Sequence, residues 1–308
     1  MSVTLRELVY PEQGEGLYEV TQFEEERMLT LRRKQPSPGG FREIQVRNFP
    51  SEAEQWRVFL GGHLDMVPQI SGGHQRYLKQ DPSVRIVPFQ ERSTCGLIFR
   101  TTSPRANDAR VRRAISLALR RRAIAEMVNG DPASAAKAPE DLAQSRALLD
   151  GLGVNLDHPL RIVIWVLSET SEFLRAALII EQQLALVNVD VDFQAMSATE
   201  LQDRLDEADF DTTANADFDA IIFFGDFERS NWDFVQYFSR YTNPELEAAA
   251  GDEARWLSIM EEQVPVTPLY QVDQSVAVDS HVCGIHPVSP GRSMWLADVH
   301  PCRPGETE

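Results

Sequence analysis

The sequence predicts an α/β fold, and three patterns carry that prediction. Residues Leu160–Val166 form a continuous apolar run, which is typical of a strand buried on both faces of a sheet. A helical pattern over Ser168–Leu186 and a strand pattern over Val187–Phe193 follow it and complete a βαβ unit. A further apolar run, Phe218–Phe224, predicts another buried strand. The core is therefore expected to be a sheet with parallel strands covered by helices.

The stretch from Pro104 to Pro132 predicts an amphipathic helix or helix pair. Asp108 is a suitable N-cap, and apolar residues repeat after it at helical spacing until Asn129 and Gly130 end the pattern. Six arginines occupy the other positions: Arg110, Arg112, Arg113, Arg120, Arg121 and Arg122. One interpretation is an ordinary helix with a solvated basic face. The other is that the pattern is the signature of a protein family.

Shorter elements are expected before this stretch. Gly14–Lys34 reads as a hairpin, because two alternating segments flank a charged turn. Ser51–Leu60 is predicted to be a helix with Ser51 as its N-cap. The remaining predictions are short strands: Phe41–Asn48, Val84–Phe89 and Cys95–Arg100.

Helices predominate among the other predicted elements of the second half. Ala133–Asp141 is a linker of small residues, and the helices Leu142–Leu149 and Ala198–Glu207 come after it. Asn188 stands at a predicted helix end, where asparagine tolerates the left-handed conformation. Late helices and a strand bracketed by prolines are expected within Asn243–Gln271, and Cys302–Glu308 is expected to fray.

Length and charge restrict the possible partners. The chain has 308 residues, enough for two moderate domains, and its net charge is −17. A chain with this negative charge repels nucleic acid and anionic membrane surfaces. Neither is therefore a predicted partner. No apolar run approaches the ~20 residues that a membrane-spanning helix needs. The first residues lack the apolar core of a signal peptide.

No pattern in the sequence predicts catalysis, a metal or another cofactor. The motifs of serine hydrolases, phosphate-binding loops and zinc peptidases are absent from the sequence, so the protein is predicted not to be an enzyme. Cys95, Cys283 and Cys302 are far apart and odd in number, and they are predicted to be unpaired thiols. His281 and His286 flank Cys283, but such scattered histidines are more often solvated than bound to a metal.

Several motifs in order resemble family 5 of the extracellular solute-binding proteins, the oligopeptide, dipeptide and nickel receptors of bacterial ABC importers. The stretch after Pro104 is similar to the hallmark helix of that family. Its matching residues are Asp108, Arg110, Val111, Arg112 and Ala114. The other matches are Gly14, Gly16 and Tyr18; Gly62 and Asp65; Arg146 to Leu149 with Gly153; and Glu261, Glu262, Pro265, Pro268, Leu269 and Tyr270.

The resemblance implies a periplasmic-binding-protein-like fold of type II, with a second lobe over residues 51–239. Residues 1–50 and 240–308 would form a reduced first lobe. The sequence that precedes the Gly-x-Gly-x-Tyr segment in the family, and that builds most of its first lobe, has no counterpart here. Arg120 replaces the aspartate that caps the second short helix in the family. An apolar surface left by the missing lobe is expected to be covered by a partner or a second copy.

Two functions follow from the resemblance and its departures. The first is a receptor for a peptide or small solute, with a reduced or lost pocket and an ABC permease as partner. The second is an adaptor or sensor that reuses the binding-protein fold for contacts with another protein. The family implies a periplasmic location, whereas the sequence as written, without a signal peptide, favours the cytoplasm.

The candidate ligand site lies at the end of the strand that Phe218 begins. In the resembled family, an aspartate after this strand meets the amino terminus of a bound peptide. Phe223, Phe224, Gly225 and Asp226 stand in the matching order. Ligands of open α/β sheets gather at such strand ends, which agrees with this placement. The alternative is that Asp226 merely ends the strand and accepts hydrogen bonds from the next turn.

Overall fold

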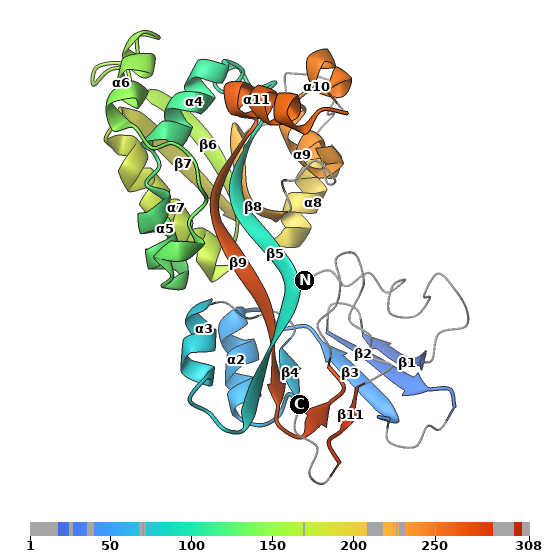
Figure 1. The fold of residues 1–308 in the computed structure, drawn as a ribbon. Coiled ribbons are helices and arrows are strands. Elements are labelled where there is room, and N and C mark those ends of the chain that lie inside the picture. The colour runs from blue at the N-terminus through green and yellow to red at the C-terminus, as the bar shows by residue number, and fades with distance from the viewer. Residues whose placement is uncertain are drawn as a thin grey trace. The chain divides into compact units, whose positions relative to one another are not determined.

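The computed structural model of the chain has a mixed α/β fold (Figure 1). It describes residues 18–24, 27–35, 40–67, 70, 72–168, 170–207, 218–225, 227, 232–249, 251–285 and 299–303. The chain forms two compact units: unit 1 comprises Met1–Arg92 and Asp273–Glu308, and unit 2 comprises Ser93–Val272. Two long strands, β5 (Val84–Phe99) and β9 (Val266–Asp279), each contribute residues to both units. The lobes expected over residues 51–239 and over residues 1–50 with 240–308 stay a prediction.

Unit 1 begins with a three-stranded antiparallel sheet. Its strands are β1 (Tyr18–Glu24), β2 (Met28–Arg33) and β3 (Glu43–Arg47), so the predicted hairpin and the next strand are confirmed. Gly14 and Gly16 lie outside the described residues. Leu31 is completely buried beneath this sheet.

Helix α2 (Glu52–Leu60) follows the sheet and begins and ends as predicted. The Ser51 side chain accepts a hydrogen bond from the backbone N–H of Glu54 at 3.2 Å. Gly62 has a φ of 71°, the left-handed conformation that glycine adopts without steric cost. Unit 1 also contains helix α3 (Gly72–Leu78) and three short strands. Strand β4 (Met66–Val67) pairs with β9. Strands β10 (Val282–Cys283) and β11 (His300–Pro301) pair with each other.

The sheet of unit 2 has the strand order β9-β5-β8-β6-β7. Strand β6 (Leu160–Leu167) is parallel to both β7 (Val189–Met196) and β8 (Ala220–Gly225). Helix α7 (Ser171–Ala185) connects β6 to β7, so the predicted βαβ unit is confirmed. Asn188 has a φ of 59° in the turn before β7, as the sequence suggests.

The prediction of two short strands, Val84–Phe89 and Cys95–Arg100, was wrong about the break between them. The structure has one strand of 16 residues, β5, which pairs with β8 in antiparallel register from Thr94↔Gly225 to Phe99↔Ala220. The polar residues 90–94 include neither glycine nor proline, so nothing in this segment forces the backbone out of the extended conformation.

Helices cover both faces of the unit 2 sheet (Figure 1). Helices α4 (Ala109–Ala118), α5 (Arg121–Asn129) and α7 pack on one face. Helices α8 (Ala198–Glu207) and α9 (Trp232–Ser239) pack on the other. The remaining elements are a 3-10 turn (Pro132–Ser134), α6 (Leu142–Asp150), α10 (Pro244–Ala248) and α11 (Glu253–Gln263).

Two arginines of the α4–α5 stretch are not part of a solvated face. Arg112 is 2% exposed and Arg121 is 1% exposed, so the expectation of an entirely solvated basic face was wrong for them. The Arg112 guanidinium donates to the carbonyl oxygens of Gln263 and Val264 at the end of α11, and to those of Ala106 and Asn107. A guanidinium has five donors in a fixed fork, so it can satisfy several carbonyls at once.

Arg121 has the same kind of environment. It donates to the carbonyl oxygens of Pro268, Ser116, Leu119 and Pro139, and thereby joins α5 to β9 and to the linker before α6. Burial lowers the pKa of Arg121, and it lowers the pKa of Arg112 to about 10. A pKa of about 10 keeps Arg112 charged at neutral pH, and both side chains connect helices to neighbouring segments.

The start of α5 has no side-chain cap of its own, as expected from the arginine at position 120. Another carboxylate compensates, because Glu140 Oε1 accepts the backbone N–H of Arg121 at 2.8 Å. The side-chain oxygen of Gln183 on α7 accepts the N–H of Arg120 at 2.7 Å. Two N–H groups at the start of α5 are thus satisfied by residues distant in the sequence.

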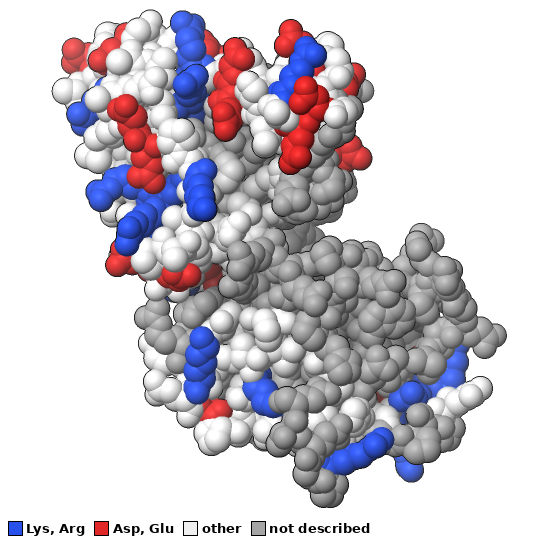
Figure 2. Space-filling model, viewed as in Figure 1, with Lys and Arg blue, Asp and Glu red and all other residues white. Residues whose placement is uncertain are grey.

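The surface charge of unit 2 is mixed. On the face that Figure 2 shows, basic and acidic side chains of the described residues are interspersed, and no single sign covers this unit. The net charge of −17 is therefore not gathered into one acidic area on this face.

Candidate functional site

The candidate site is the carboxyl end of β8 in unit 2. The register with β6 ends at Val166↔Ile222, whereas pairing with β5 continues to Gly225. Phe223, Phe224 and Gly225 therefore extend past the paired part of β6, at the edge where the parallel strands end. Asp226 lies outside the described residues.

The two phenylalanines point to opposite faces of the sheet, as adjacent residues of a strand must. The Phe224 ring centroid lies 4.3 Å from that of Phe173 and 6.5 Å from that of Tyr270, whose ring is nearly perpendicular to it. The Phe223 ring lies 5.3 Å from Phe238 on α9, on the other face. Both rings are only half-buried, so each keeps part of its surface for a further contact.

The first turn of α7 lies at the same edge. The helix starts at Ser171, four residues after β6 ends, and the Phe173–Phe224 contact holds its amino end against β8. Glu172 in this turn is 8% exposed, and a carboxylate there interacts favourably with the helix dipole. Sequence reasoning did not identify Glu172 or Phe173, although their position just after an apolar strand was a usable signal.

A fixed pair of residues lies beneath the Phe224 ring. Cys95 on β5 is completely buried, and burial raises the pKa of its thiol to about 12. Burial likewise raises the pKa of Tyr270, whose side chain neighbours Cys95. At neutral pH both groups keep their protons, so this thiol is not a nucleophile.

Phe227 fixes the chain just after the candidate residues. A Cβ atom built on Gly96 of β5 would lie 2.3 Å from a ring carbon of Phe227, so this ring occupies the space that a side chain at position 96 would need. The residues on both sides of Asp226 in the chain are therefore positioned by β5: Gly225 pairs with Thr94, and Phe227 covers Gly96.

A buried carboxylate positions the other end of β8. Asp219 is 1% exposed and accepts hydrogen bonds from Ser103 Oγ, from Arg105 Nε at 3.1 Å, and from the backbone N–H of Val163 at 2.7 Å. These bonds join β8 to β6 and to the loop that precedes α4. The hydrogen bonds of Asp219 hold β8 in register with β6. With this register, the carboxyl end of β8, which carries Phe223 and Phe224, extends past the paired part of β6.

The described residues contain no group of three or more histidine, cysteine or acidic side chains that could hold a metal ion. None of the helices in the described parts of the chain is long and apolar enough to cross a membrane. The end of β8 has half-buried aromatic faces beside the first turn of α7.

Comparisons with known proteins agree with this architecture. The family model described as bacterial extracellular solute-binding proteins, family 5 Middle, matches residues 13–241. No curated protein sequence matches the chain at a significant level.

Solved structures resemble nearly the whole chain. The oligopeptide-binding protein AppA from Bacillus subtilis, in complex with a nonapeptide, has a TM-score of 0.79 at 14% identity; the match covers 94% of this chain and 67% of that one. The dipeptide-binding protein from Pseudoalteromonas sp. SM9913, in complex with Met-Leu, has a TM-score of 0.78 at 15% identity, covering 94% and 64%. The murein tripeptide-binding protein MppA from Escherichia coli has a TM-score of 0.74 at 19% identity, again covering 94% and 64%.

The chain thus spans about two thirds of the length of these structures, and at such identities the likeness concerns the fold. It confirms the predicted fold class, a periplasmic-binding-protein-like α/β fold. Because the family model matches more than half of its 308 residues, the chain belongs to family 5 of the bacterial extracellular solute-binding proteins.

Proposed function

We propose that this chain is the solute-binding component of an ABC importer, that its ligand is peptide-like, and that the ligand's ammonium group meets Asp226. The family supports a binding role, and the three related structures above carry peptide-binding names. The observation that carries the proposal is the contact at 4.3 Å between Phe173 and Phe224, which brings the first turn of α7 to the end of β8. Asp226 comes two residues after Phe224 in the chain.

The chemistry of these residues suits such a ligand. A carboxylate facing an ammonium group makes a charge-assisted hydrogen bond, which is stronger than a neutral one. The half-buried rings of Phe223 and Phe224 can pack against ligand side chains or backbone. Since the two rings face opposite sides of the sheet, a ligand that touches both must lie across the end of the strand. Gly225 has no side chain to obstruct that position.

A reduced pocket is part of the proposal. Two-lobed receptors gain binding energy by closing two walls over a ligand, and this chain spans 64–67% of the length of the three structures. We therefore expect weak binding of free peptides by these 308 residues. Calorimetric titration with a library of di- to pentapeptides measures it. A ligand with sub-micromolar affinity would contradict the reduced pocket but not the receptor role.

Asp226→Asn tests the site itself. The substitution should weaken the best ligand of the library by about 1–3 kcal/mol, the usual loss for a hydrogen bond to a charged group. Asp157→Asn is the matched control, because Asp157 is an exposed carboxylate on a loop of unit 2. Equal affinities of the Asp226 variant and the parent, with both proteins folded, would make Asp226 a strand-terminating residue instead.

The second candidate function is an adaptor or sensor that binds another protein. Large apolar side chains are exposed on both units, among them Tyr77 at 80% and Leu156 at 87%, and such side chains are available for contacts with a partner protein. Sedimentation of the protein at micromolar concentration, alone and mixed with an ABC permease, measures association and distinguishes the two functions. Association with the permease supports the receptor, whereas a stable complex with another protein, together with no peptide binding, supports the adaptor.

A further inference from the structure

The cysteines of unit 1 form a feature that the sequence did not suggest. Cys283 and Cys302 are joined in a disulfide, so the expectation of three unpaired thiols was wrong. The reason is the pairing of β10 with β11, which brings residues separated by 19 positions to neighbouring strand positions. Cys95 remains a free thiol and is buried in unit 2.

The two sulfurs have different accessibility. Cys283 is 1% exposed, whereas Cys302 is half-buried near the end of the described chain. In thiol–disulfide exchange, a thiolate attacks one sulfur and the other sulfur leaves as a thiolate. An external thiolate can therefore reach Cys302, and an attack there expels Cys283.

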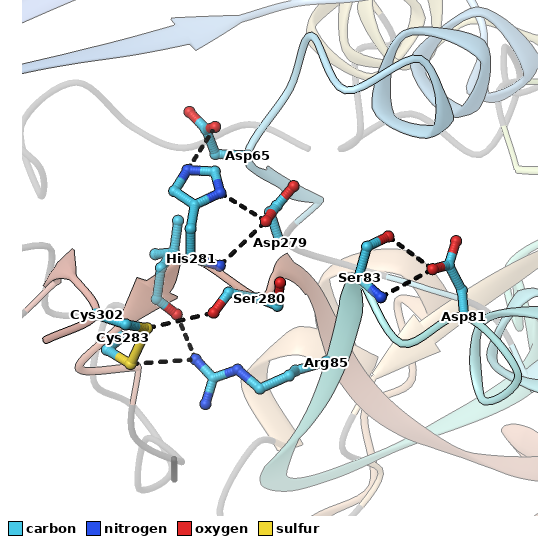
Figure 3. A network of polar contacts seen from close by, with 10 residues as sticks. Asp65, Asp81, Ser83, Arg85, Asp279, Ser280, His281, Cys283 and Cys302 are labelled. Atoms are coloured by element: carbon cyan, nitrogen blue, oxygen red, sulfur yellow. Dashed lines mark hydrogen bonds and ion pairs between the residues drawn. A yellow bond between two sulfur atoms is a disulfide. The ribbon is translucent and has the colours of Figure 1, made fainter. Parts of the chain in front are cut away.

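The two sulfurs also have different electrostatic environments (Figure 3). Arg85 Nη2 lies 4.0 Å from Cys283 Sγ and also donates to the carbonyl oxygen of Val282. By contrast, Cys302 Sγ lies 3.3 Å from the carbonyl oxygen of Ser280, the negative end of a dipole. A neighbouring cation stabilises a thiolate and a neighbouring carbonyl oxygen does not, so Arg85 offsets the cost that burial imposes on negative charge at Cys283.

The nearby carboxylates are bound to other groups. Asp279 Oδ1 lies 2.6 Å from His281 Nδ1, Asp65 Oδ1 lies 3.2 Å from His281 Nε2, and Asp81 accepts a hydrogen bond from Ser83 (Figure 3). The Arg85 guanidinium is not held by these carboxylates in Figure 3 and lies next to the disulfide, at Cys283. Accessibility and charge therefore favour the same direction of reaction.

We propose that the Cys283–Cys302 disulfide is a thiol–disulfide exchange site, attacked at Cys302 by an external dithiol, with Cys283 as the leaving thiolate beside Arg85. The dithiol's thiolate forms a bond to Cys302 Sγ, the Sγ–Sγ bond breaks, and its electron pair remains on Cys283 Sγ. The second thiol of the reagent then displaces Cys302 as a thiolate. The dithiol loses two electrons and becomes a disulfide, and its two protons pass to the protein thiolates or to water.

Reduction weakens the attachment of residues 299–303 to unit 1. The non-covalent contacts that remain include the two residue pairs of β10 and β11, the hydrogen bond from the Cys302 N–H to the His281 carbonyl at 2.8 Å, and the buried Val299 side chain. A strand pair this short is marginal without a covalent link. The exchange would thus release a segment near the C-terminus in response to the surrounding thiol redox state.

The first test maps the site of attack in the unaltered protein. The oxidised chain is mixed with a monothiol, glutathione, trapped with excess N-ethylmaleimide at neutral pH, acidified, and digested for peptide mass spectrometry. The glutathione adduct is expected on Cys302 and the maleimide on Cys283. An adduct mainly on Cys283 would overturn the proposal, and so would a disulfide that excess dithiothreitol leaves intact in the folded protein.

The second test measures the role of Arg85 through the rate of reduction by dithiothreitol. Arg85→Gln should slow the reaction about 3–10-fold, because the leaving thiolate loses its neighbouring cation. Arg85→Lys keeps the charge and should stay within about 2-fold of the parent. Lys79→Gln is the matched control, because it removes an exposed positive charge of unit 1. Equal slowing by the two Arg85 variants would assign Arg85 a structural role and refute its effect on the leaving group.

Discussion

The two units keep polar groups in their interiors in different ways. Unit 2 buries the guanidinium groups of Arg112 and Arg121 and the carboxylate of Asp219, each with several hydrogen-bond partners. In unit 1, the histidine held by two carboxylates is exposed, since the side chains of His281 and Asp65 are 55% and 72% exposed. The disulfide of unit 1 joins a buried Cys283 to a half-buried Cys302.

The difference follows from the sizes of the hydrophobic cores. Unit 2 has a large apolar cluster on one face of its sheet and a second cluster on the other. Such an interior can surround a fully satisfied guanidinium group with apolar side chains. The described part of unit 1 has three small clusters, and small cores commonly depend on covalent links. Substitutions in unit 2 should therefore act through desolvated polar groups, and those in unit 1 through the disulfide.

The largest effect is expected at Arg112. Arg112→Met keeps most of the side-chain volume but leaves the carbonyl oxygens of Gln263, Val264, Ala106 and Asn107 without their donor. The free energy of unfolding of unit 2 should fall by about 3–5 kcal/mol, as when a buried charged group is removed from its partners. Urea denaturation followed by circular dichroism measures the change.

Arg113→Met is the control for this substitution, because Arg113 is the next residue on α4 and is exposed. Its effect should stay within about 0.5 kcal/mol, as is usual at surface positions. If both variants lost the same stability, the buried hydrogen bonds of Arg112 would not be what stabilises the α4–α11 contact.

The disulfide of unit 1 should have a smaller effect. The double substitution Cys283→Ala with Cys302→Ala opens a loop with a sequence separation of 19 residues. On the chain-entropy model, closing a loop of that size stabilises by about 3 kcal/mol. Native-state hydrogen exchange of the β2 and β9 amides in unit 1 measures the loss. The amides of β6 and β7 in unit 2 serve as the internal control. If the protection of the unit 1 amides did not change, the disulfide would not be the main stabiliser of unit 1.

The smallest effect concerns the cap of α4 in unit 2. Hydrogen bonds from the Arg110 side chain and backbone lower the pKa of Asp108 below its ordinary value of about 3.9. A lowered carboxyl pKa stabilises the fold above that ordinary value, and the stabilisation is lost as the pH falls through the lower folded-state value.

Asp108→Ala should therefore cost about 1 kcal/mol at pH 7, the usual loss of an N-cap. The difference between variant and parent should shrink towards pH 2. Denaturation midpoints across this pH range measure it, with Asp157→Ala as a control on an exposed loop. A constant difference at all pH values would mean that the charge of Asp108 does not contribute.

Local patterns were sufficient to predict most elements of the fold. The caps at Ser51 and Asp108, the left-handed turns at Gly62 and Asn188, and the βαβ unit around α7 all depend on neighbours in the sequence. The continuity of β5 was missed, because a polar segment without glycine or proline signals neither a break nor a strand.

Long-range pairing could not be predicted from those patterns. The burial of Arg112 depends on carbonyl groups about 150 positions later, and the disulfide depends on the pairing of β10 with β11. At the candidate site, the strand and its phenylalanines were predicted, whereas the contact of Phe224 with Phe173 follows only from the packing of α7 on β8. The ligand role of Phe223, Phe224, Gly225 and Asp226 stays a prediction.

The cap that Glu140 provides for α5 makes two distant positions epistatic. An aspartate at position 120 would normally favour the start of a helix, but here it would place a second carboxylate beside Glu140, which already accepts the Arg121 N–H. The same replacement becomes more favourable once residue 140 is an alanine, because the second carboxylate is then absent and the new cap can accept a backbone N–H one or two positions after Arg121. The order in which the two positions change thus decides whether each step stabilises or destabilises the protein.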